Sequence, residues 1–167
     1  MGEVKSAYFA VRRGEAQFEI AFDPPLRLTG GSASRAHFVL QRVRRLIKRE
    51  GLKPRLSGGQ LRAIVLLDDE KRLSEILIAV DAVLDKIAAR PLDPHEVEEA
   101  LRITARELKL WTKARRLPTS GQGSFRKGQK IFFCRYPTSA IAELAAQPEL
   151  IACWRDDDLR RGAKGQD

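Results

Sequence analysis

Cysteine and histidine are scarce in this sequence, with two of each among 167 residues. Cys134 and Cys153 both lie in apolar stretches, and neither histidine is near them. A zinc site needs about four such ligands at short spacings, and a disulfide framework needs several cysteines at recurring intervals. We therefore expect two buried free thiols, no metal and no cofactor. His37 and His95 have no nucleophile beside them, so the sequence predicts no enzyme.

A long apolar run is also missing. No uninterrupted stretch reaches the roughly 20 apolar residues that a membrane-spanning helix requires. The first residues, from Gly2 to Lys5, lack the apolar core of a secretory signal. We expect a cytoplasmic protein with no membrane partner.

The phosphate-binding motif GxxxxGK[ST] is absent, although one peptide resembles part of an ATPase. Leu56–Gln60 spells LSGGQ, the signature peptide of ABC-type ATPases, and the stretch that follows resembles a Walker B strand. Nucleotide chemistry needs the missing phosphate cradle, and the few residues between Gln60 and Asp68 leave no room for the expected helix. We interpret the peptide as a Gly-Gly turn that enters a buried strand. An ATPase stays a third hypothesis that rests on this peptide alone.

Residues 1–91 predict a small α+β domain with the order β-β-α-β-α. Phe18, Ile20 and Phe22 alternate with polar or small residues, which is typical of a half-buried strand in a hairpin. Helices are predicted over 34–50 and 70–89, where apolar residues recur at three- and four-residue steps. The basic residues of the first helix, Arg35 among them, are expected on its solvent-exposed face. We expect this domain to dimerise or to bind a partner.

Positive charge is concentrated in the second half of the chain. The stretch from Arg102 to Arg135 has ten Lys/Arg residues and a single acid, Glu107. Its net charge of +9 equals the formal charge of the whole chain. Such a surplus favours a polyanionic partner, either nucleic acid or an acidic membrane face.

Two helix-start signals stand close together in this half. Asp93 and Glu96 form one capping box, with Pro94 at the first helical position, and Thr104 and Glu107 form another. Their spacing allows only a short helix and a tight turn, which is the helix-turn-helix pattern. On the second helix, the spacing of Leu108 and Trp111 predicts the core-facing side.

The second helix and the segment after it predict a basic surface. Arg106, Lys109 and Lys113 should project together from the helix toward a DNA groove. Residues 119–124 are expected to be irregular, and a basic loop then leads into the apolar strand Ile131–Cys134. A basic loop that ends in a strand is typical of a wing, whose side chains contact phosphates or the minor groove.

One spacing of residues runs without a gap from Val97 to Pro118. It approximates the pattern V-A-x-x-L-x-V-S-x-x-T-[VL]-x-x-W-x-x-x-G-x-L-P, with Thr104 at the Ser position and Arg115 at the Gly position. The matching residues are Val97, Leu101, Ile103, Thr104, Leu108, Trp111, Leu117 and Pro118. On this pattern, residues 95–144 resemble the MerR-like winged helix of the excisionase type. The resemblance implies a DNA-binding domain with a recognition helix and a wing.

The sequence therefore predicts an α+β protein whose second domain, residues 92–158, is a winged helix-turn-helix, followed by a disordered tail over 159–167. The expected function is sequence-specific binding of double-stranded DNA without catalysis, by a bacterial-type transcription regulator or excisionase-like architectural factor. A homodimer or cooperative oligomer is expected because one such motif offers a modest contact area. An alternative is a protein-interaction adaptor that uses the winged-helix shape to bind another regulator. The predicted DNA-binding residues are Arg102, Thr104, Arg106, Lys109, Lys113, Arg115, Arg116, Ser124, Arg126, Lys127 and Lys130.

Overall fold

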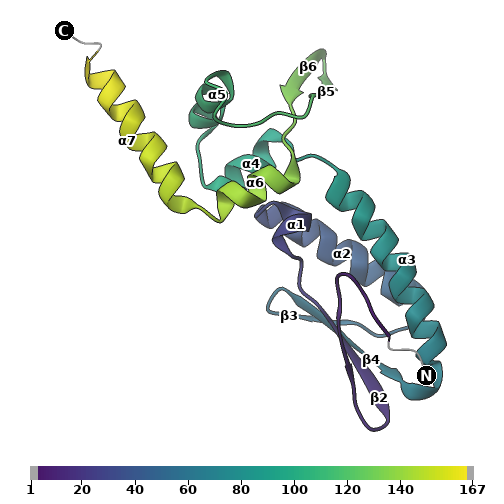
Figure 1. Ribbon diagram of the computed structural model, residues 1–167. Coiled ribbons are helices and arrows are strands. Elements are labelled where there is room, and N and C mark those ends of the chain that lie inside the picture. Colours follow the sequence, from purple (N-terminus) through teal and green to yellow (C-terminus); the bar gives the residue numbers. More distant parts are fainter. Residues whose placement is uncertain (1–3, 165–167) are drawn as a thin grey trace. The chain divides into compact units, whose positions relative to one another are not determined.

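The computed structural model of the chain describes residues 4–164 and has the predicted α+β class (Figure 1). The described residues contain helices α1 to α7, an antiparallel four-stranded sheet and a separate β-hairpin. The chain divides into two compact units. The N-terminal unit comprises Met1–Thr29 and Ser34–Arg90, and the C-terminal unit comprises Gly30–Ala33 and Pro91–Asp167. Every helix among the described residues is too short or too polar to cross a membrane.

The sheet of the N-terminal unit has the order β1-β2-β4-β3, with every neighbouring pair antiparallel. The predicted hairpin is confirmed as β1 (Ala10–Arg13) and β2 (Gln17–Phe22). The predicted order β-β-α-β-α is incomplete, because a second hairpin, β3 (Arg55–Ser57) and β4 (Gln60–Leu66), stands where one strand was expected.

The second hairpin explains the LSGGQ peptide. Gly58 and Gly59 form its turn with φ angles of 58° and 78°, in the left-handed region that residues with side chains rarely adopt. Two positive φ angles in succession are typical of the turn that best matches the twist of paired strands. The glycines therefore serve strand pairing, and the interpretation of this peptide as a Gly-Gly turn is confirmed.

Side chains of the sheet alternate between a buried and an open face. Phe18, Ile20 and Phe22 of β2 are buried, as are alternate residues of β4, and they form one core with α2 (Ala33–Arg49) and α3 (Glu70–Ala89). Both long helices lie on this side of the sheet (Figure 1). The short helix Leu26–Thr29 (α1) lies between β2 and α2, and the short helix Leu67–Asp69 (η1) lies between β4 and α3. On the opposite face of the sheet, Arg62, Ile64 and Leu66 of β4 are exposed.

Arg35 corrects one prediction about α2. Its side chain is buried, although the sequence places it on the exposed basic face. Its Nε donates to the Leu28 carbonyl at 2.8 Å, and Nη2 donates to the carbonyls of Ile87 and Arg90 at 2.5 and 2.6 Å. A guanidinium placed against carbonyls at the C-terminal end of α3 adds a donor there, and its charge complements the helix dipole.

The C-terminal unit begins with the helix-turn-helix. Its elements are α4 (Pro94–Leu101), α5 (Ala105–Lys113), β5 (Gln122–Lys127), β6 (Gln129–Cys134), α6 (Thr138–Ala145) and α7 (Pro148–Lys164). Its buried core is Leu92, Val97, Leu101, Ile103, Leu108, Trp111, Leu117, Tyr136, Ile141 and Ile151. Leu92, before α4, and Tyr136, after the hairpin, exchange backbone hydrogen bonds of 2.8 and 3.0 Å. That bridge fixes the base of the hairpin to the start of the helix-turn-helix.

The prediction that the chain frays near Asp158 and is disordered beyond it is wrong for residues 159–164. Helix α7 continues through Lys164, and residues 165–167 lie outside the described part. The acids at 156–158 therefore lie within the helix, and Asp158 is fixed by partners on the helix-turn-helix, as shown below.

Candidate nucleic-acid interface

The turn between α4 and α5 is built from short-range hydrogen bonds, and both predicted capping boxes are confirmed. Asp93 accepts from the Glu96 amide at 3.0 Å while its own amide donates to Glu96 Oε2 at 3.0 Å. At the start of α5, the Thr104 amide donates to Glu107 Oε2 at 2.7 Å and the Glu107 amide donates to Thr104 Oγ1 at 3.2 Å. Arg102 closes α4 in the left-handed conformation, with φ 53°. These contacts fix the direction of α5 independently of any ligand.

Helix α5 divides sharply into two faces. Leu108 and Trp111 are buried in the core of the unit, as their spacing predicts. Arg106, Lys109 and Lys113 are all exposed, and their three- and four-residue spacing places them together on the opposite face. The structure therefore brings these three predicted residues onto one basic surface.

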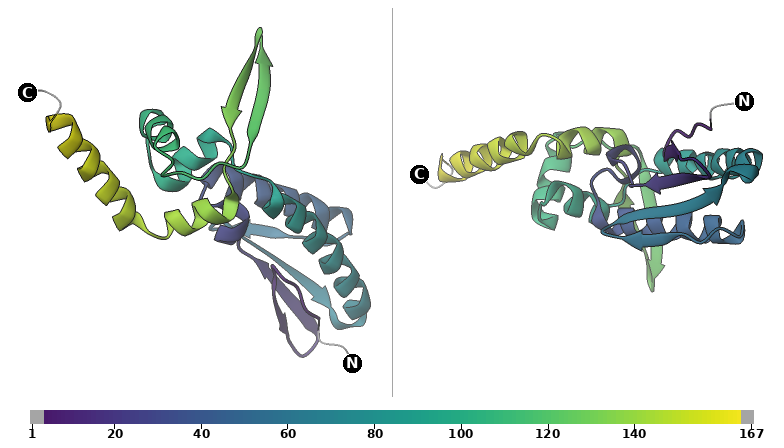
Figure 2. Two further views of the ribbon diagram at one scale, coloured as in Figure 1. Left: turned by 45° about the horizontal axis from the view of Figure 1, so that its top comes forward. Right: turned by 90° about the horizontal axis from the view of Figure 1, so that it is seen from below.

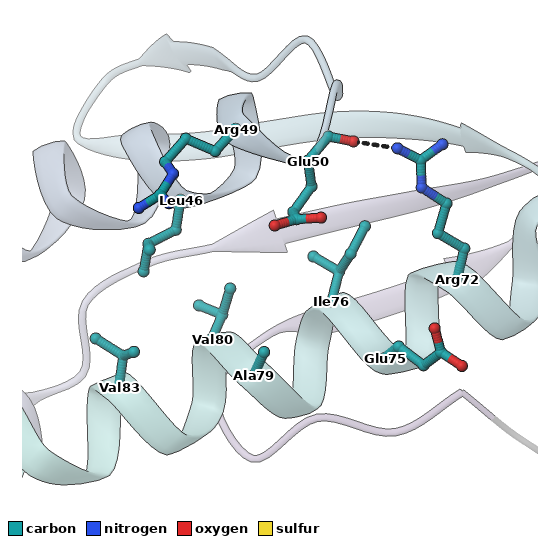
Figure 3. Close-up of a pocket in the computed structure, with 9 residues that line it drawn as sticks. All are labelled: Leu46, Arg49, Glu50, Arg72, Glu75, Ile76, Ala79, Val80 and Val83. Atoms are coloured by element: carbon teal, nitrogen blue, oxygen red, sulfur yellow. Dashed lines mark hydrogen bonds between the residues drawn. The ribbon is translucent and has the colours of Figure 1, made fainter.

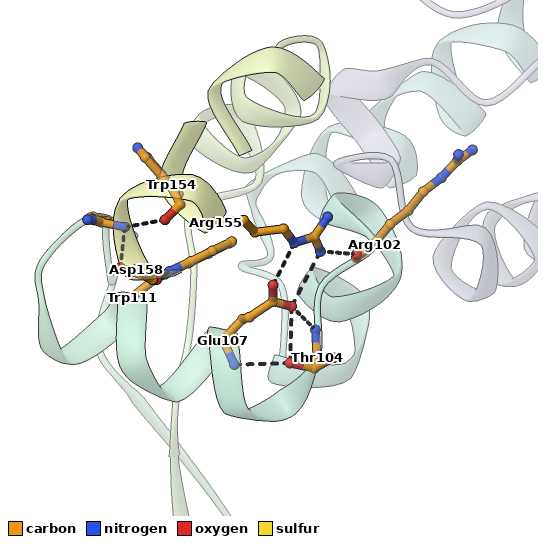
Figure 4. Close-up of polar contacts among 8 residues, drawn as sticks. Arg102, Thr104, Glu107, Trp111, Trp154, Arg155 and Asp158 are labelled. Carbon is orange, nitrogen blue, oxygen red and sulfur yellow. Dashed lines mark hydrogen bonds and ion pairs between the residues drawn. The ribbon is translucent and has the colours of Figure 1, made fainter. Parts of the chain in front are cut away.

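The one acid of this helix is neutralised by α7. Arg155 donates from Nε to Glu107 Oε1 at 2.6 Å and from Nη2 to the Arg102 carbonyl at 2.9 Å (Figure 4). The hydrogen bond from Arg155, together with those from Thr104, lowers the pKa of Glu107 to about 2 despite partial burial. The same pair raises the pKa of Arg155. Glu107 consequently lies at the flank of α5 as one half of an ion pair, and its charge is offset beside the basic face.

A second set of contacts holds α7 against the buried side of α5. Trp111 Nε1 donates to Asp158 Oδ2 at 2.7 Å, and the rings of Trp111 and Trp154 meet edge to face with centroids 5.1 Å apart (Figure 4). Arg116 Nη1 donates to Asp158 Oδ1 at 3.1 Å and to the Trp154 carbonyl at 3.3 Å. Arg116 is thus committed to the fold, although the sequence places it among the DNA-binding residues.

The predicted wing is a full β-hairpin that projects from the rest of its unit (Figure 2). The prediction that residues 119–124 are irregular is wrong from Gln122 onward, because β5 begins there and pairs with β6. Gly128, with φ 76°, forms the tip. Gly123 lies against the Phe133 ring so closely that a Cβ would come within 2.5 Å of it, so close pairing at the base requires glycine.

The strand register sorts the hairpin's side chains onto two faces. Ser124 pairs with Phe132 and Arg126 pairs with Lys130, and directly opposed residues share a face. Lys127 belongs to the other face, which also carries the apolar residues Phe125, Ile131 and Phe133. The sequence groups Ser124, Arg126, Lys127 and Lys130 as one contact set, whereas the structure separates Lys127 from the other three.

Exposed aromatic rings on the hairpin form a feature that sequence reasoning missed. Phe132 is 61% exposed and Phe125 is 50% exposed. The Lys130 ammonium lies 5.1 Å from the centre of the Phe132 ring, within range of a cation–π interaction. The sequence describes Ile131–Cys134 as a compact apolar strand, and the strand is confirmed. Its apolar side chains are largely on the surface because a two-stranded hairpin has no third layer to cover them.

The other predicted residues divide into exposed and committed positions. Arg102 and Arg115 are exposed, and both have left-handed backbones, Arg115 with φ 58° where the resembled pattern has glycine. Thr104 is exposed, but its hydroxyl both accepts from and donates to Glu107 in the capping box. Thr104 and Arg116 therefore have structural partners that compete with any role in DNA contact.

No cluster of His, Cys, Asp or Glu suited to a metal ion is found among residues 4–164. Both cysteines are free thiols. Cys134 is half-buried and Cys153 is exposed, so the prediction of two buried thiols is wrong for Cys153. Cys153 lies outside the face of α7 formed by Trp154, Arg155 and Asp158, which contact α5 and the residues that flank it.

Comparison with known protein families, with curated proteins and with solved structures finds no match to this chain. The functional conclusion therefore depends on the geometry of the described residues and on the sequence pattern.

Proposed function

We propose that this chain is a cytoplasmic, sequence-specific double-stranded DNA-binding protein that acts without catalysis, either as a transcription regulator or as an excisionase-like architectural factor. The observation that carries the proposal is the arrangement of α5. Arg106, Lys109 and Lys113 share its exposed face, while the only acid of the helix is paired with Arg155. A helix with one basic face and a fixed N-terminal turn suits insertion into the major groove.

The hairpin extends this surface in the proposed complex. Arg126 and Lys130 share one face with Ser124, so two cations and a hydroxyl are available to neighbouring phosphates. Phosphate contacts fix the position of a protein on the duplex, whereas groove contacts choose the sequence. We assign the first role to the hairpin and the second to α5.

A protein-interaction adaptor is the second candidate function. It is favoured by the exposed apolar face of the hairpin, where Phe125 and Ile131 lie open to solvent beside Phe133. Exposed apolar clusters often mark protein contacts. Salt separates the two functions, because binding through several phosphates weakens by orders of magnitude between about 50 and 200 mM salt, whereas binding through apolar contacts does not.

We also propose that the protein is a homodimer through the outer side of α3. A hollow of about 500 Å³ lies between α2 and α3, with Leu46, Ile76, Val80 and Val83 in its lining (Figure 3). Ile78, which lies between the lining residues Ile76 and Ala79 in the sequence of α3, is 63% exposed. Arg49, Glu50, Arg72 and Glu75 also line the hollow. An exposed isoleucine beside this partly apolar hollow offers a surface that a second copy can bury.

The charges along α3 favour a second copy over another partner. Glu75, Ala79, Ala82 and Lys86 follow one another at three- and four-residue steps on the exposed side. In two antiparallel copies related by a two-fold axis, Glu75 would oppose Lys86 and Ala79 would oppose Ala82. The row is therefore self-complementary, with small residues at its centre that allow close approach.

The test of the main proposal begins with selection of duplexes from a random library at low salt. Binding of the selected duplex is then compared with a scrambled duplex of the same length. The proposal expects enrichment of a defined site and at least a tenfold preference for it. Enrichment of no sequence, together with retained binding to a partner protein at 200 mM salt or above, favours the adaptor.

A further inference from the structure

We propose that the open face of the N-terminal sheet is a second contact site for the phosphodiester backbone of nucleic acid, centred on Lys53, Arg55 and Arg62. The proposal rests in part on the proposed function, because it assigns a second surface to the same class of ligand. All residues of the proposed site belong to the N-terminal unit. The site lies on the sheet and is separate from the exposed basic face of α2.

The strand register places two arginines face to face. Arg55 of β3 is the direct partner of Arg62 of β4, and both side chains are exposed on the side of the sheet that the helices do not cover. Like charges directly opposed across strands destabilise the pairing. Local features that disfavour folding are expected at functional sites, where other contacts offset their cost. An anion held between the two guanidinium groups would remove the repulsion.

The surroundings of this pair form a shallow basic hollow. A hollow of about 520 Å³ is lined by Lys53, Arg55, Ser57, Gln60 and Arg62, with Glu19 and Ile64 among the other lining residues. Arg55 and Ser57 alternate along β3 and so project from the same side of the strand, and Lys53, just before β3, lines the same hollow. Three cations and two uncharged hydrogen-bonding side chains thus converge on one surface, against a single acid.

The one acid, Glu19, orients Arg62 and leaves the net charge of the surface positive. Glu19 Oε1 lies 3.7 Å from Arg62 Nη1, and Gln60 Oε1 accepts from Arg62 Nε at 2.8 Å. These two contacts hold the guanidinium of Arg62 in position over the hollow. Arg12, which the register places opposite Glu19, adds a further positive charge at the same face. The net charge of these groups stays positive.

The mixture of side chains favours nucleic acid over a membrane surface. Ser57 and Gln60 donate and accept hydrogen bonds as the uncharged residues that contact sugars and phosphates do. Ile64, which is 59% exposed beside the hollow, offers an apolar surface to a ribose ring. Because the cations are spread over β1, β4, β3 and the residues before β3, the site fits an extended polyanion better than a single small anion.

The experiment compares two pairs of substitutions in the full-length chain. Lys53→Ala with Arg55→Ala removes two charges from the open sheet face. Arg45→Ala with Lys48→Ala removes two exposed charges from α2, on the other side of the same unit, and is the matched control. Affinity for a 40-base-pair duplex is measured by fluorescence anisotropy at several salt concentrations.

The sheet pair is expected to make the plot of log affinity against log salt less steep by about 1.8, since each lost phosphate contact changes the slope by about 0.9. The control pair is expected to change it by less than about 0.5. Equal effects of the two pairs, or no effect of the sheet pair, overturn the proposal. The proposal is also overturned if the wild-type chain binds no duplex. It is overturned as well if the sheet-pair variant binds the duplex like the wild type and differs only in its binding to vesicles that contain an anionic lipid.

A third variant separates this inference from the proposed function. Arg106→Ala, Lys109→Ala and Lys113→Ala remove the basic face of α5 without touching the sheet. If they leave duplex binding unchanged while the sheet pair weakens it, the sheet site stands and the winged-helix function fails. If they abolish site preference while the sheet pair has no effect, the function stands and the sheet site fails.

Discussion

Arg155 on α7 pairs with Glu107 on α5 across 48 residues of sequence, with a shortest N–O distance of 2.6 Å. The same guanidinium donates to the Arg102 carbonyl at the end of α4. One side chain therefore joins both helices of the helix-turn-helix to the C-terminal helix. It also offsets the negative charge of Glu107, the one acid of α5. The remainder of α7 supports this arrangement through Trp154 and Asp158.

The ion pair predicts a pH dependence of stability. The pKa of Glu107 is lowered from 4.5 to about 2, so the carboxylate binds its proton less readily in the folded state. The stability that it contributes is present in full above about pH 4.5 and is lost as the pH falls toward 2. The contribution is about 1 kcal/mol or less, because both side chains are partly exposed to solvent.

Glu107→Gln tests this dependence, because Gln retains the capping-box acceptor and removes only the charge. Both tryptophans, Trp111 and Trp154, lie in the C-terminal unit, so their fluorescence during urea unfolding reports on that unit. The variant should be less stable than the wild type at pH 6 and equal to it near pH 2. Glu143→Gln, on an exposed acid of α6, is the control and should change little at either pH. A difference that is the same at both pH values would show that the ion pair is not its cause.

Truncation of Trp111 is expected to lower the stability of the C-terminal unit strongly. The side chain is fully buried, packs edge to face on Trp154 and donates to Asp158. Trp111→Ala should destabilise the C-terminal unit by about 3–5 kcal/mol because it leaves a cavity and removes the donor to Asp158 Oδ2. Trp111→Phe should cost less, since the ring contact is retained. Urea unfolding followed by circular dichroism measures both, and equal losses would argue against the packing role.

The two faces of the hairpin predict unequal effects on DNA binding. Arg126→Ala and Lys130→Ala should each weaken binding similarly at every sequence and reduce the salt slope by about 1. Lys127→Ala removes the same charge from the apolar face and should reduce the slope by less than about half that amount. Fluorescence anisotropy with a selected and a scrambled duplex provides the comparison. Three equal effects would mean that the hairpin acts only through its total charge.

The proposed dimer predicts a charge-swap rescue. Glu75→Lys alone and Lys86→Glu alone should each weaken self-association, because like charges would then meet across the two-fold axis. The double variant should restore it, since the row is again self-complementary. Light scattering after size exclusion distinguishes the 18.8 kDa monomer from its dimer.

Ile78→Glu should also give the monomer. Leu159→Glu, at an exposed apolar position on α7, is the control. A wild-type chain that stays monomeric at high concentration would refute the dimer while leaving the DNA surface untouched.

Much of the helix-turn-helix is predictable because its signals are local. The capping boxes at Asp93 and Thr104 use bonds between residues three apart, and Leu108 and Trp111 share a face through the helical period. The partners of Glu107, Trp111 and Arg116 on α7 are 38 to 48 residues away, and no local sequence pattern indicates them. The sequence accordingly places Arg116 on the DNA and leaves Arg155 unnoticed.

The predictions for Arg35 and for residues 122–124 fail for the same reason, because contacts distant in sequence decide their structure. Arg35 fits the exposed side of α2 by charge, but its acceptors are the carbonyls of Ile87 and Arg90 at the end of a later helix. Strand β5 contains glycine and serine, which have low strand propensity, and pairing with β6 overrides that tendency. Gly123 is the one residue of β5 that indicates close strand pairing, because its missing side chain makes room for Phe133.

The most direct test of the proposed function is the salt dependence of duplex binding by the wild type and by the variant Arg106→Ala, Lys109→Ala and Lys113→Ala. The wild type should bind its selected duplex at about 50 mM salt and lose affinity by orders of magnitude at about 200 mM. The variant should fold normally by circular dichroism, lose its preference for the selected site, and show a shallower salt slope. A folded variant that retains the wild-type affinity, site preference and slope would contradict the account.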